Sequence, residues 1–229
     1  MISVPNRQQL SSGNKMNIYL LSESSHEGVI NLPLIKANYF EISLDISSYE
    51  ALVFSSKNAV YALDKIDKNW RNIPAFAIGE ATASVITKLG GNLAYVANNA
   101  YGNDFAYEII EKLKGKKVAF LRAKKILSNL EEILHSEKIQ LDSHILYETI
   151  CNVQNTFYPI EKNSIIIFTS PSTVECFFRS YTWDNSSHAV CIGNVTSKAL
   201  PMYIKNLHVS SKQTIKGCIE LAKTLIKQN

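Results

Sequence analysis

The sequence lacks the motifs that mark several common classes of protein. It contains no G-x-G-x-x-G or G-x-x-x-x-G-K-[ST] stretch, and Gly115-Lys116-Lys117 has neither the upstream glycine nor the hydroxyl of a phosphate-binding loop. No Ser/His/Asp or Cys/His order points to a covalent nucleophile. No apolar run approaches the roughly 20 residues of a membrane-spanning helix. These absences argue against a glycine-rich nucleotide site and against a membrane protein.

Cysteine and histidine are scarce, and their spacing fits no metal site. The chain has 4 cysteines and 5 histidines, with no C-x-x-C pair and no H-E-x-x-H frame. We therefore expect no metal centre. We expect the cysteines to be free and mostly buried thiols, at Cys151, Cys176, Cys191 and Cys218.

A strong excess of one charge is also missing. The 24 Lys and Arg residues outnumber the 20 Asp and Glu residues only slightly, which gives a net charge of +4. The densest basic cluster, over residues 114–125, is as compatible with a solvated face around a strand as with an anion site. Nucleic-acid binders usually gather basic residues on one face beside stacking aromatics. We therefore expect no nucleic-acid partner, and a small polyanionic ligand suits this charge better.

The amino-terminal stretch has few apolar residues. Residues 1–15 are polar and lack the apolar region of a signal peptide, whereas Met16 directly precedes the first strand-like run. We expect residues 1–15 to form a disordered extension, and we expect a cytoplasmic protein.

What the chain does contain is an internal repeat. Phe54-Ser55-Ser56 and Gly79-x-x-Thr82 return, 114 residues later in both cases, as Phe168-Thr169-Ser170 and Gly193-x-x-Thr196. Self-similarity at one fixed offset indicates related structural units. This offset is too long for a solenoid, and it favours two related half-molecules.

Short apolar runs alternate with helical patterns along most of the chain. Such alternation predicts an α/β fold with parallel sheets, and continuous apolar strands are typical of sheets covered by helices on both faces. Asn58 and Asn103 are the expected N-caps of two of the helices. The predicted strands are 17–21, 39–46, 51–54, 75–78, 93–96, 117–121, 144–150, 165–168, 189–192 and 207–209, and the predicted helices are 58–66, 81–89, 104–113, 128–136, two that start at 173 and 195, and 215–226.

These elements are too many for one sheet and divide unequally along the chain. Residues 42–146 hold a complete set of βα units, whereas the block after 150 has only three strands. The strand near the amino terminus would complete its sheet. We therefore expect a discontinuous first domain, 16–38 with 150–229, into which a second domain, 42–146, is inserted. The crossings near 36–42 and 145–151 are both strand-like and are expected to pair as a two-stranded ladder.

The repeated motifs lie where strands end and helices begin. Ligands of open parallel sheets bind at the carboxyl ends of strands, and the unpaired N–H groups of a helix start attract anions. Each hydroxyl alone is better explained as an ordinary helix N-cap, but matched positions in both halves favour a ligand cleft. The residues expected to line it are Ser55, Ser56, Gly79, Thr82, Thr169, Ser170, Gly193 and Thr196.

From Met16 to the end the chain resembles the uroporphyrinogen-III synthase family. The resemblance is carried by the two F-[ST]-S motifs, the two I-G-x-x-T motifs, Phe120-Leu121-Arg122 before a helix, and Leu146-Tyr147-Glu148-Thr149. It implies two flavodoxin-like or Rossmann-like domains joined by a two-stranded β-ladder, the first split around the second. It also implies a cofactor-independent, cyclising hydro-lyase that is expected to be a monomer. The implied small-molecule substrate is hydroxymethylbilane, a linear tetrapyrrole polycarboxylate, which is closed to uroporphyrinogen III.

The resemblance also implies roles for individual residues. Tyr147 matches the family's most important tyrosine, and a phenol with a pKa of about 10 can donate a proton to the departing hydroxyl. From the residues alone, an ordinary amphipathic strand residue is the better interpretation of Tyr147, and the resemblance reverses that preference. Arg122 is a possible carboxylate partner. Lys57 and Ala123 depart from the proline and glycine common in the family, and Ala123 makes the role of Arg122 the weakest of these assignments.

Two other classes remain open on the residues alone. A non-catalytic, two-lobed protein that binds a small polycarboxylate would use the same helix starts and would have no need of Tyr147. A nucleotide-dependent transferase is disfavoured by the absence of a glycine-rich loop.

Overall fold

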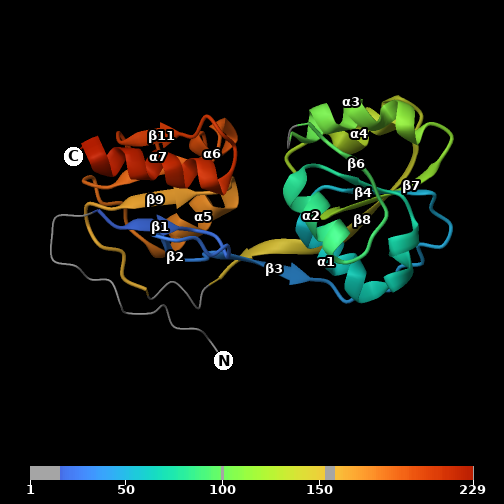
Figure 1. Cartoon of the computed structure of the whole chain (residues 1–229), viewed down its shortest axis with the longest axis horizontal. Helices are drawn as coiled ribbons and strands as arrows, with labels where there is room; N and C mark the ends of the chain where they lie inside the picture. Colours follow the sequence, from blue (N-terminus) through green and yellow to red (C-terminus); the bar gives the residue numbers. More distant parts are fainter. Residues whose placement is uncertain (1–15, 99–100, 153–157, 229) are drawn as a thin grey trace. The chain divides into compact units, whose positions relative to one another are not determined.

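The chain divides into two compact units. The structure, a computed structural model, describes residues 16–98, 101–152 and 158–228, so the extension predicted over 1–15 lies outside the described residues. Unit 1 comprises Met1–Lys36 and Ile150–Asn229, and unit 2 comprises Ala37–Thr149 (Figure 1).

Unit 2 is built on a six-stranded sheet in the order β3-β8-β7-β4-β5-β6. Neighbouring strands from β8 to β6 pair in parallel. Helices cover both faces, as the apolar runs predicted. The elements are β3 (Ile35–Tyr39), β4 (Ala51–Phe54), α1 (Lys57–Ile66), η1 (Lys68–Asn72), β5 (Ala75–Ala77), α2 (Glu80–Lys88), β6 (Leu93–Val96), α3 (Gly102–Leu113), β7 (Lys117–Ala123), α4 (Leu130–Ser136) and β8 (Gln140–Cys151).

Alternate residues of β4 show why this strand reads as a continuous apolar run. Leu52 and Phe54 belong to the core on the α1 and α2 face, whereas Ala51 and Val53 belong to the core on the α3 and α4 face. Because successive strand residues point to opposite faces, a strand with helices on both sides has no polar side. All four residues are fully buried.

Unit 1 is built on a five-stranded sheet in the order β11-β10-β9-β1-β2, paired in parallel throughout. The strand from the start of the described chain, β1, lies between β9 and β2. Separate cores form against α5 and against α7. The elements are β1 (Ile18–Leu20), β2 (Ile30–Asn31), β9 (Ile165–Phe168), α5 (Pro171–Ser180), β10 (His188–Cys191), α6 (Asn194–Ser197), β11 (Leu207–Val209) and α7 (Ile215–Gln228).

The chain passes between the units inside β3 and inside β8, which are neighbouring strands. The strand predicted over 39–46 is wrong for most of its length, because β3 ends at Tyr39. The Phe40 N–H donates to the Leu146 carbonyl, 3.0 Å away, and regular pairing stops there. Leu44 and Ile46 pack against the core of the α1 and α2 face. The alternation in the sequence therefore reflects one-sided burial without a partner strand.

Two predicted helix caps are also wrong. The N-cap of α1 is Ser56 and not Asn58, because the Ser56 hydroxyl accepts from the Asn58 and Ala59 N–H groups. The N-cap of α3 is Tyr101. Asn103 instead accepts, through Oδ1, from the Asn129 N–H at 2.8 Å, and so ties the start of α3 to the start of α4.

The prediction of four free thiols is wrong for one pair. Cys151, the last residue of β8, forms a disulfide with Cys176 of α5, 25 residues further along the chain. The fold brings the strand end and the helix together, which the sequence spacing alone does not reveal. Cys191 and Cys218 are free and buried, as predicted. Within the described residues, no helix is long and apolar enough to cross a membrane.

Candidate functional site

The candidate site of unit 2 lies at the carboxyl ends of its central strands. Ser55 and Ser56 directly follow β4, and Gly79 follows β5 and caps α2. Tyr147 comes from β8, two strands away from β4 in the sheet. Its hydroxyl oxygen lies 2.6 Å from Ser56 Oγ. Two residues predicted separately, one by the repeat and one by the family resemblance, are therefore in direct contact.

A shift in strand register places Tyr147 on the face of the sheet that α1 and α2 cover. Arg122 of β7 pairs with Ile145, but the next residue, Ala123, pairs with Tyr147, so that Leu146 is an extra residue in β8. An extra strand residue re-aims the side chains that follow it. Leu146 and Tyr147 consequently both join the core of the α1 and α2 face, where Ser56 starts α1.

The Tyr147 phenol is buried, and its environment keeps it protonated. Its side chain packs in the core, and the residue is 4% exposed. Burial raises the pKa of Tyr147 above 10.0, and the hydrogen bond with Ser56 opposes this rise in part. Desolvation disfavours the charged phenolate. At neutral pH the group is therefore a hydroxyl with a proton to donate.

The other predicted residues of unit 2 surround this pair less directly. Thr82 is buried in the first turn of α2, and its N–H donates to the Gly79 carbonyl at 3.0 Å. Ser55 Oγ donates to the Leu121 carbonyl over 3.4 Å, a weak contact. Both hydroxyl groups thus lie at strand and helix ends, in agreement with the predicted position of a binding edge.

Arg122 already has partners inside unit 2. Its Nε donates to Ser143 Oγ at 2.7 Å, its Nη1 donates to the Ala123 carbonyl at 3.0 Å, and Glu131 lies 3.5 Å from Nε. The guanidinium group therefore helps to hold β7, β8 and α4 together. The Lys124 side chain is more exposed, and its ammonium group lies 3.1 Å from the Glu148 carboxylate.

Unit 1 carries the matching motifs with a different local chemistry. Thr169 and Ser170 follow β9, and Ser170 caps α5 in a capping box with Thr173. Gly193 caps the short helix α6, in which Thr196 is buried. These residues share the carboxyl edge of the unit 1 sheet, whereas Tyr147 and Ser56 belong to unit 2.

The two motif glycines are not required by backbone strain. Gly79 and Gly193 have φ angles of 170° and −173°, an extended conformation open to any residue. A Cβ atom added to Gly193 would lie 3.6 Å from the nearest side-chain atom, in Gln213, which is an ordinary contact. The internal contacts of the chain therefore do not explain a glycine at position 193.

Sequence reasoning missed Tyr39, a neighbour of Tyr147, and Lys65, a neighbour of Tyr39. The ring of Tyr39, at the end of β3, lies 6.3 Å from the Tyr147 ring, centre to centre. The Lys65 ammonium group lies 4.3 Å from the centre of the Tyr39 ring. No motif marks either residue. The sequence signal at Tyr39 was the strand-like pattern near 36–42, which was expected to pair with 145–151, and β3 is the neighbour of β8.

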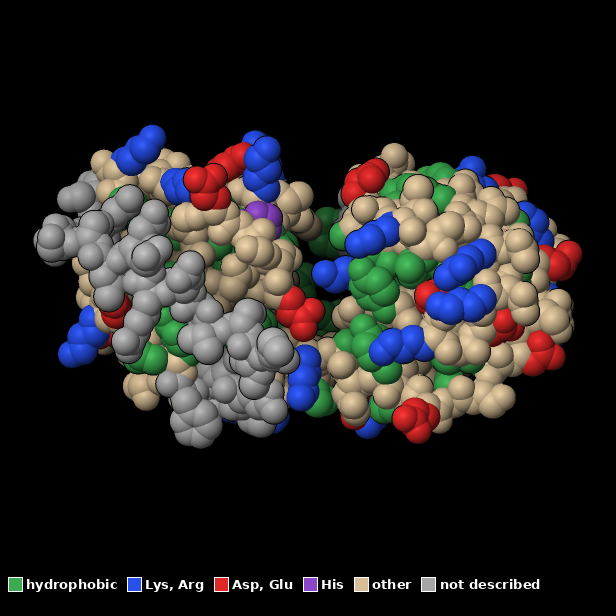
Figure 2. Space-filling model, turned by 60° about the horizontal axis from the view of Figure 1, so that its bottom comes forward, with side chains coloured by type: hydrophobic (Ala, Val, Ile, Leu, Met, Phe, Trp, Pro, Cys, Tyr) green, Lys and Arg blue, Asp and Glu red, His purple; other side chains and the backbone are tan. Residues whose placement is uncertain are grey.

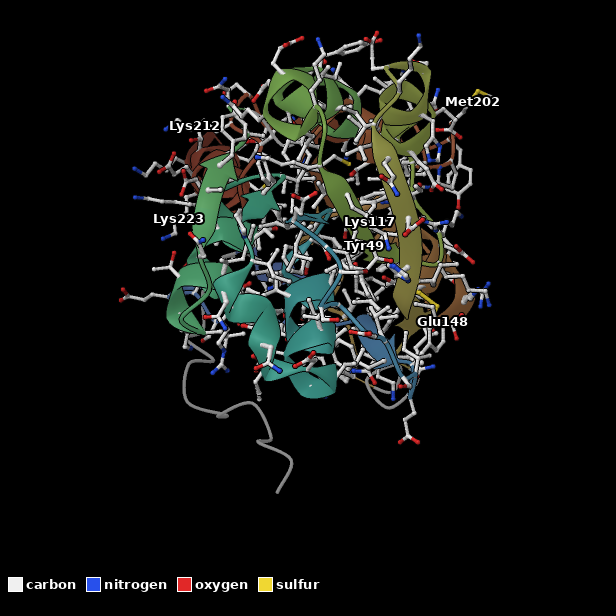
Figure 3. All side chains as sticks on the ribbon, turned by 90° about the vertical axis from the view of Figure 1, so that its right-hand side faces the viewer. Tyr49, Lys117, Glu148, Met202, Lys212 and Lys223 are labelled. Atoms are coloured by element: carbon white, nitrogen blue, oxygen red, sulfur yellow. A yellow bond between two sulfur atoms is a disulfide. The ribbon has the colours of Figure 1, made fainter. Side chains whose placement is uncertain are left out.

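A second polar cluster lies nearer the amino ends of β7 and β8. Tyr49 donates to Asp142 Oδ2 at 2.9 Å and lies 2.9 Å from His144 Nε2, and Lys117 sits 4.8 Å from the Tyr49 ring centre (Figure 3). Burial, followed by the hydrogen bond to Asp142, raises the pKa of Tyr49 to about 12. The cluster fastens the segment that follows β3 onto β8.

Neither the charges on the face drawn in Figure 2 nor the possible metal ligands among the described residues mark a further binding site. On the face drawn in Figure 2, Lys and Arg side chains are scattered over both units among Asp and Glu. Among the residues that the structure describes, no group of three or more His, Cys, Asp or Glu side chains is arranged to hold a metal ion.

Fold and site together define a two-unit α/β protein with parallel sheets, which presents hydroxyl groups at strand ends and a buried Ser–Tyr pair. The chain belongs to the uroporphyrinogen-III synthase family, since the family model described as "Uroporphyrinogen-III synthase HemD" matches residues 20–220. The predicted family and the predicted fold class are therefore confirmed.

Individual relatives agree with this assignment. The uroporphyrinogen-III synthetase of Helicobacter pylori is 29% identical, with a TM-score of 0.78 over 92% of this chain and 99% of that one. A mutant uroporphyrinogen III synthase of Thermus thermophilus, 12% identical with a TM-score of 0.57 over 93% of this chain and 100% of that one, shares the fold. The porphyrin biosynthesis protein HemD of Ruminiclostridium josui is 28% identical over 192 residues. That match covers 77% of this chain but only 38% of the relative's length.

Proposed function

We propose that this chain is a uroporphyrinogen-III synthase, which cyclises hydroxymethylbilane with loss of water and inversion of the terminal pyrrole ring. The observation that carries the proposal is the contact between Tyr147 and Ser56, 2.6 Å apart at the carboxyl edge of the unit 2 sheet. Membership of the family supplies the reaction. The contact supports the proposal because it brings a protonated phenol next to a serine at the end of a strand.

Tyr147 is the proposed general acid. As the C–O bond of the hydroxymethyl group breaks, the phenolic proton goes to the departing oxygen, and water leaves. The electron pair of the pyrrole nitrogen stabilises the carbon cation that remains. The substituted carbon of the terminal pyrrole attacks this cation to give a spiro intermediate, which reopens and closes with the ring inverted. The proton lost when that ring regains aromaticity returns to the Tyr147 phenolate, so the cycle balances without a cofactor.

Strand-end groups of both units are the proposed substrate-binding residues. The substrate carries many carboxylates, and N–H groups at helix starts suit them. Arg122 is the weakest member of the set, because its guanidinium group already contacts Ser143 and Glu131. The proposed binding residues are Ser55, Ser56, Gly79, Thr82, Arg122, Thr169, Ser170, Gly193 and Thr196.

A monomeric state and a cytoplasmic location belong to the same proposal. Light scattering after size-exclusion chromatography checks the first. The second is tested by the Cys151–Cys176 bond, because structural disulfides persist mainly in oxidising compartments. Recovery of this bond from alkylated cell extracts, with cell fractionation, would show which environment the protein occupies.

The proposed activity is tested by incubating the purified chain with freshly prepared hydroxymethylbilane and separating the product isomers after oxidation. We expect uroporphyrinogen III in excess over the spontaneous I isomer. Samples without protein and with heat-denatured protein are the controls. An unchanged isomer ratio would reject the synthase. Substrate binding without turnover would instead support a non-catalytic polycarboxylate-binding protein.

A further inference from the structure

The hydroxyl group of Ser56 has three hydrogen-bond neighbours. Ser56 Oγ lies 3.2 Å from the Asn58 N–H nitrogen, 3.4 Å from the Ala59 N–H nitrogen and 2.6 Å from Tyr147 Oη. A serine hydroxyl has one proton to donate and two lone pairs to accept with. Both backbone N–H groups can only donate. The Asn58 N–H and the Ala59 N–H, which is shared with the Ser56 carbonyl at 3.1 Å, therefore face the lone pairs of Oγ. The Ser56 proton is then left for Tyr147, and Ser56 is the donor in the shortest of the three bonds.

This direction decides what the Tyr147 proton can do. Because Tyr147 Oη accepts from Ser56, the Tyr147 O–H is not used in that bond. Over the part of the chain that the structure describes, the Tyr147 hydroxyl has no second hydrogen-bond partner. Its proton therefore points away from Ser56.

We infer that Ser56 is a positioning residue, whose O–H turns the Tyr147 proton outward for donation and then stabilises the phenolate that donation leaves behind. This inference rests on the proposed function, since it gives a second role to a residue first assigned to substrate binding. Ser56 acts through Tyr147 and is not itself the acid.

Helix α1 strengthens this arrangement. The Asn58 and Ala59 N–H groups belong to the first turn of α1, whose N-terminus carries partial positive charge. They polarise the Ser56 hydroxyl and make it a better donor. A hydrogen bond to a charged acceptor is about twice as strong as one between neutral groups, so the contact strengthens when Tyr147 becomes a phenolate. In agreement, the Ser56 bond lowers the pKa of Tyr147 against the larger effect of burial.

Ser170, the matching serine of unit 1, shows that a serine can cap a helix in this position without a tyrosine partner. Ser170 has φ and ψ of −167° and 163°, close to the −169° and 160° of Ser56. Its Oγ accepts from the Thr173 N–H at 3.2 Å, and the Thr173 hydroxyl closes the capping box on the Ser170 backbone. The position that corresponds to Thr173 in unit 2 is Ala59. The Ser56 cap therefore lacks a side-chain partner within its helix and uses Tyr147.

The direct test follows the ionisation of Tyr147 without any substrate. The protein is prepared with 3-fluorotyrosine, which lowers the phenol pKa enough for titration of the folded chain. The fluorine NMR signal of Tyr147, one of 11 tyrosines, is assigned from Tyr147→Phe. Ser56→Gly removes the hydroxyl yet keeps a residue that caps helices well. Ser56→Thr keeps the hydroxyl, and Ser170→Gly is the matched control in unit 1.

We expect the Tyr147 titration to move to higher pH in Ser56→Gly and to stay near the wild-type position in Ser56→Thr and Ser170→Gly. An unmoved signal in Ser56→Gly overturns the inference, and so does an equal shift in Ser170→Gly. Because no substrate is present, this result is independent of whether the chain makes uroporphyrinogen III.

Steady-state kinetics supply the second test. Loss of a hydrogen bond to a charged group predicts a fall in kcat of about tenfold or more in Ser56→Gly, with a much smaller change in KM and with recovery in Ser56→Thr. A raised KM at unchanged kcat would instead show that Ser56 acts in substrate binding alone and would overturn the positioning role. Absence of turnover in the wild-type chain would reject the proposed function and leave the titration result standing.

Discussion

The helix starts at Ser56 and Ser170 are built alike, yet their hydroxyl groups serve different partners. Both serines follow a buried strand and cap a helix with nearly the same backbone angles. In unit 1, Thr173 closes the cap by itself. In unit 2, the hydroxyl reaches Tyr147 on another strand. The repeated motif thus supplies a helix cap twice, and in unit 2 the capping hydroxyl also contacts a buried phenol.

The two units also differ in what stabilises them. All four cysteines lie in unit 1, which contains the disulfide, whereas residues 37–149 contain none. Unit 2 instead buries Asp64, which accepts from Trp70 Nε1 at 3.0 Å and from Arg71 Nη2 at 2.8 Å. Each unit also contains one of the two tryptophans, Trp70 in unit 2 and Trp183 in unit 1. Fluorescence can therefore follow the two units separately.

The largest expected effect comes from removing the phenol that distinguishes unit 2. We predict that Tyr147→Phe lowers kcat by about 10²–10⁴-fold, the usual contribution of a general acid. The isomer assay measures the rate. Tyr95→Phe is the matched control, because that phenol bonds Glu108 instead. Full activity in Tyr147→Phe would remove the acid role and leave family membership intact.

The second largest effect concerns the disulfide of unit 1. Reduction of Cys151–Cys176 should lower the free energy of unfolding of unit 1 by about 2–4 kcal/mol, because the bond restricts the unfolded chain. Denaturation followed through Trp183 in Trp70→Phe measures this loss, and Trp70 in Trp183→Phe should report little change. A Cys151→Ala/Cys176→Ala variant should be insensitive to the reductant. Equal losses in both units would contradict the assignment.

A smaller effect tests the capping box at the start of α5 in unit 1, which has no counterpart at the start of α1 in unit 2. Thr173→Ala gives unit 1 the residue that unit 2 has at position 59, and we expect it to cost about 1 kcal/mol of unit 1 stability. The loss of the capping box is the physical reason. Hydrogen exchange of the first amides of α5 should accelerate. Unchanged exchange in α5, with faster exchange in α1, would contradict the conclusion that Thr173 stabilises the start of α5.

The smallest effect is a difference in acid sensitivity. Burial lowers the pKa of His188 and His208 in unit 1 below 6.5. Because the unfolded chain binds these protons at higher pH than the folded chain, stability is lost as pH falls from 6.5 through the folded pKa values. In unit 2, burial and then Lys117 lower the pKa of His144, against an opposing effect of Asp142.

Unfolding curves at several pH values, followed through the two tryptophans, compare the units. Unit 1 should lose stability more steeply between about pH 7 and pH 5. A His188→Asn/His208→Gln variant should flatten that slope. If the slope stays the same, other groups cause the acid sensitivity of unit 1.

Local patterns predicted most elements of the fold. The strand predicted over 51–54 is β4, because burial on both faces leaves a plain apolar run. Alternation over 39–46 was misleading, since it records burial on one side and cannot show whether a partner strand exists. Position in the sequence likewise could not reveal that Cys151 meets Cys176, because that contact depends on the packing of β8 against α5.

The residues of the candidate site could be predicted from the sequence, but the contacts between them could not. Ser56 was predicted at a strand end and Tyr147 on a strand. Their contact depends on the face to which Tyr147 points, and one residue more or less in a strand reverses that face. No motif marked Tyr39 or Lys65 as site residues, because the contact of Tyr39 with Tyr147 and that of Lys65 with Tyr39 form through tertiary packing.

The extra residue in β8 has a consequence for judging relatives of this chain. Arg122 pairs with Ile145 and Ala123 with Tyr147, so Leu146 is the residue that turns the phenol towards α1. A homologue that kept a residue at position 146 but paired this strand regularly, with no extra residue opposite Ala123, would keep its tyrosine, its serines and its glycines, and would satisfy any motif search. Its phenol would face the opposite side of the sheet, so the pairing of this strand, which no motif records, decides whether the phenol can reach the serine at the start of α1.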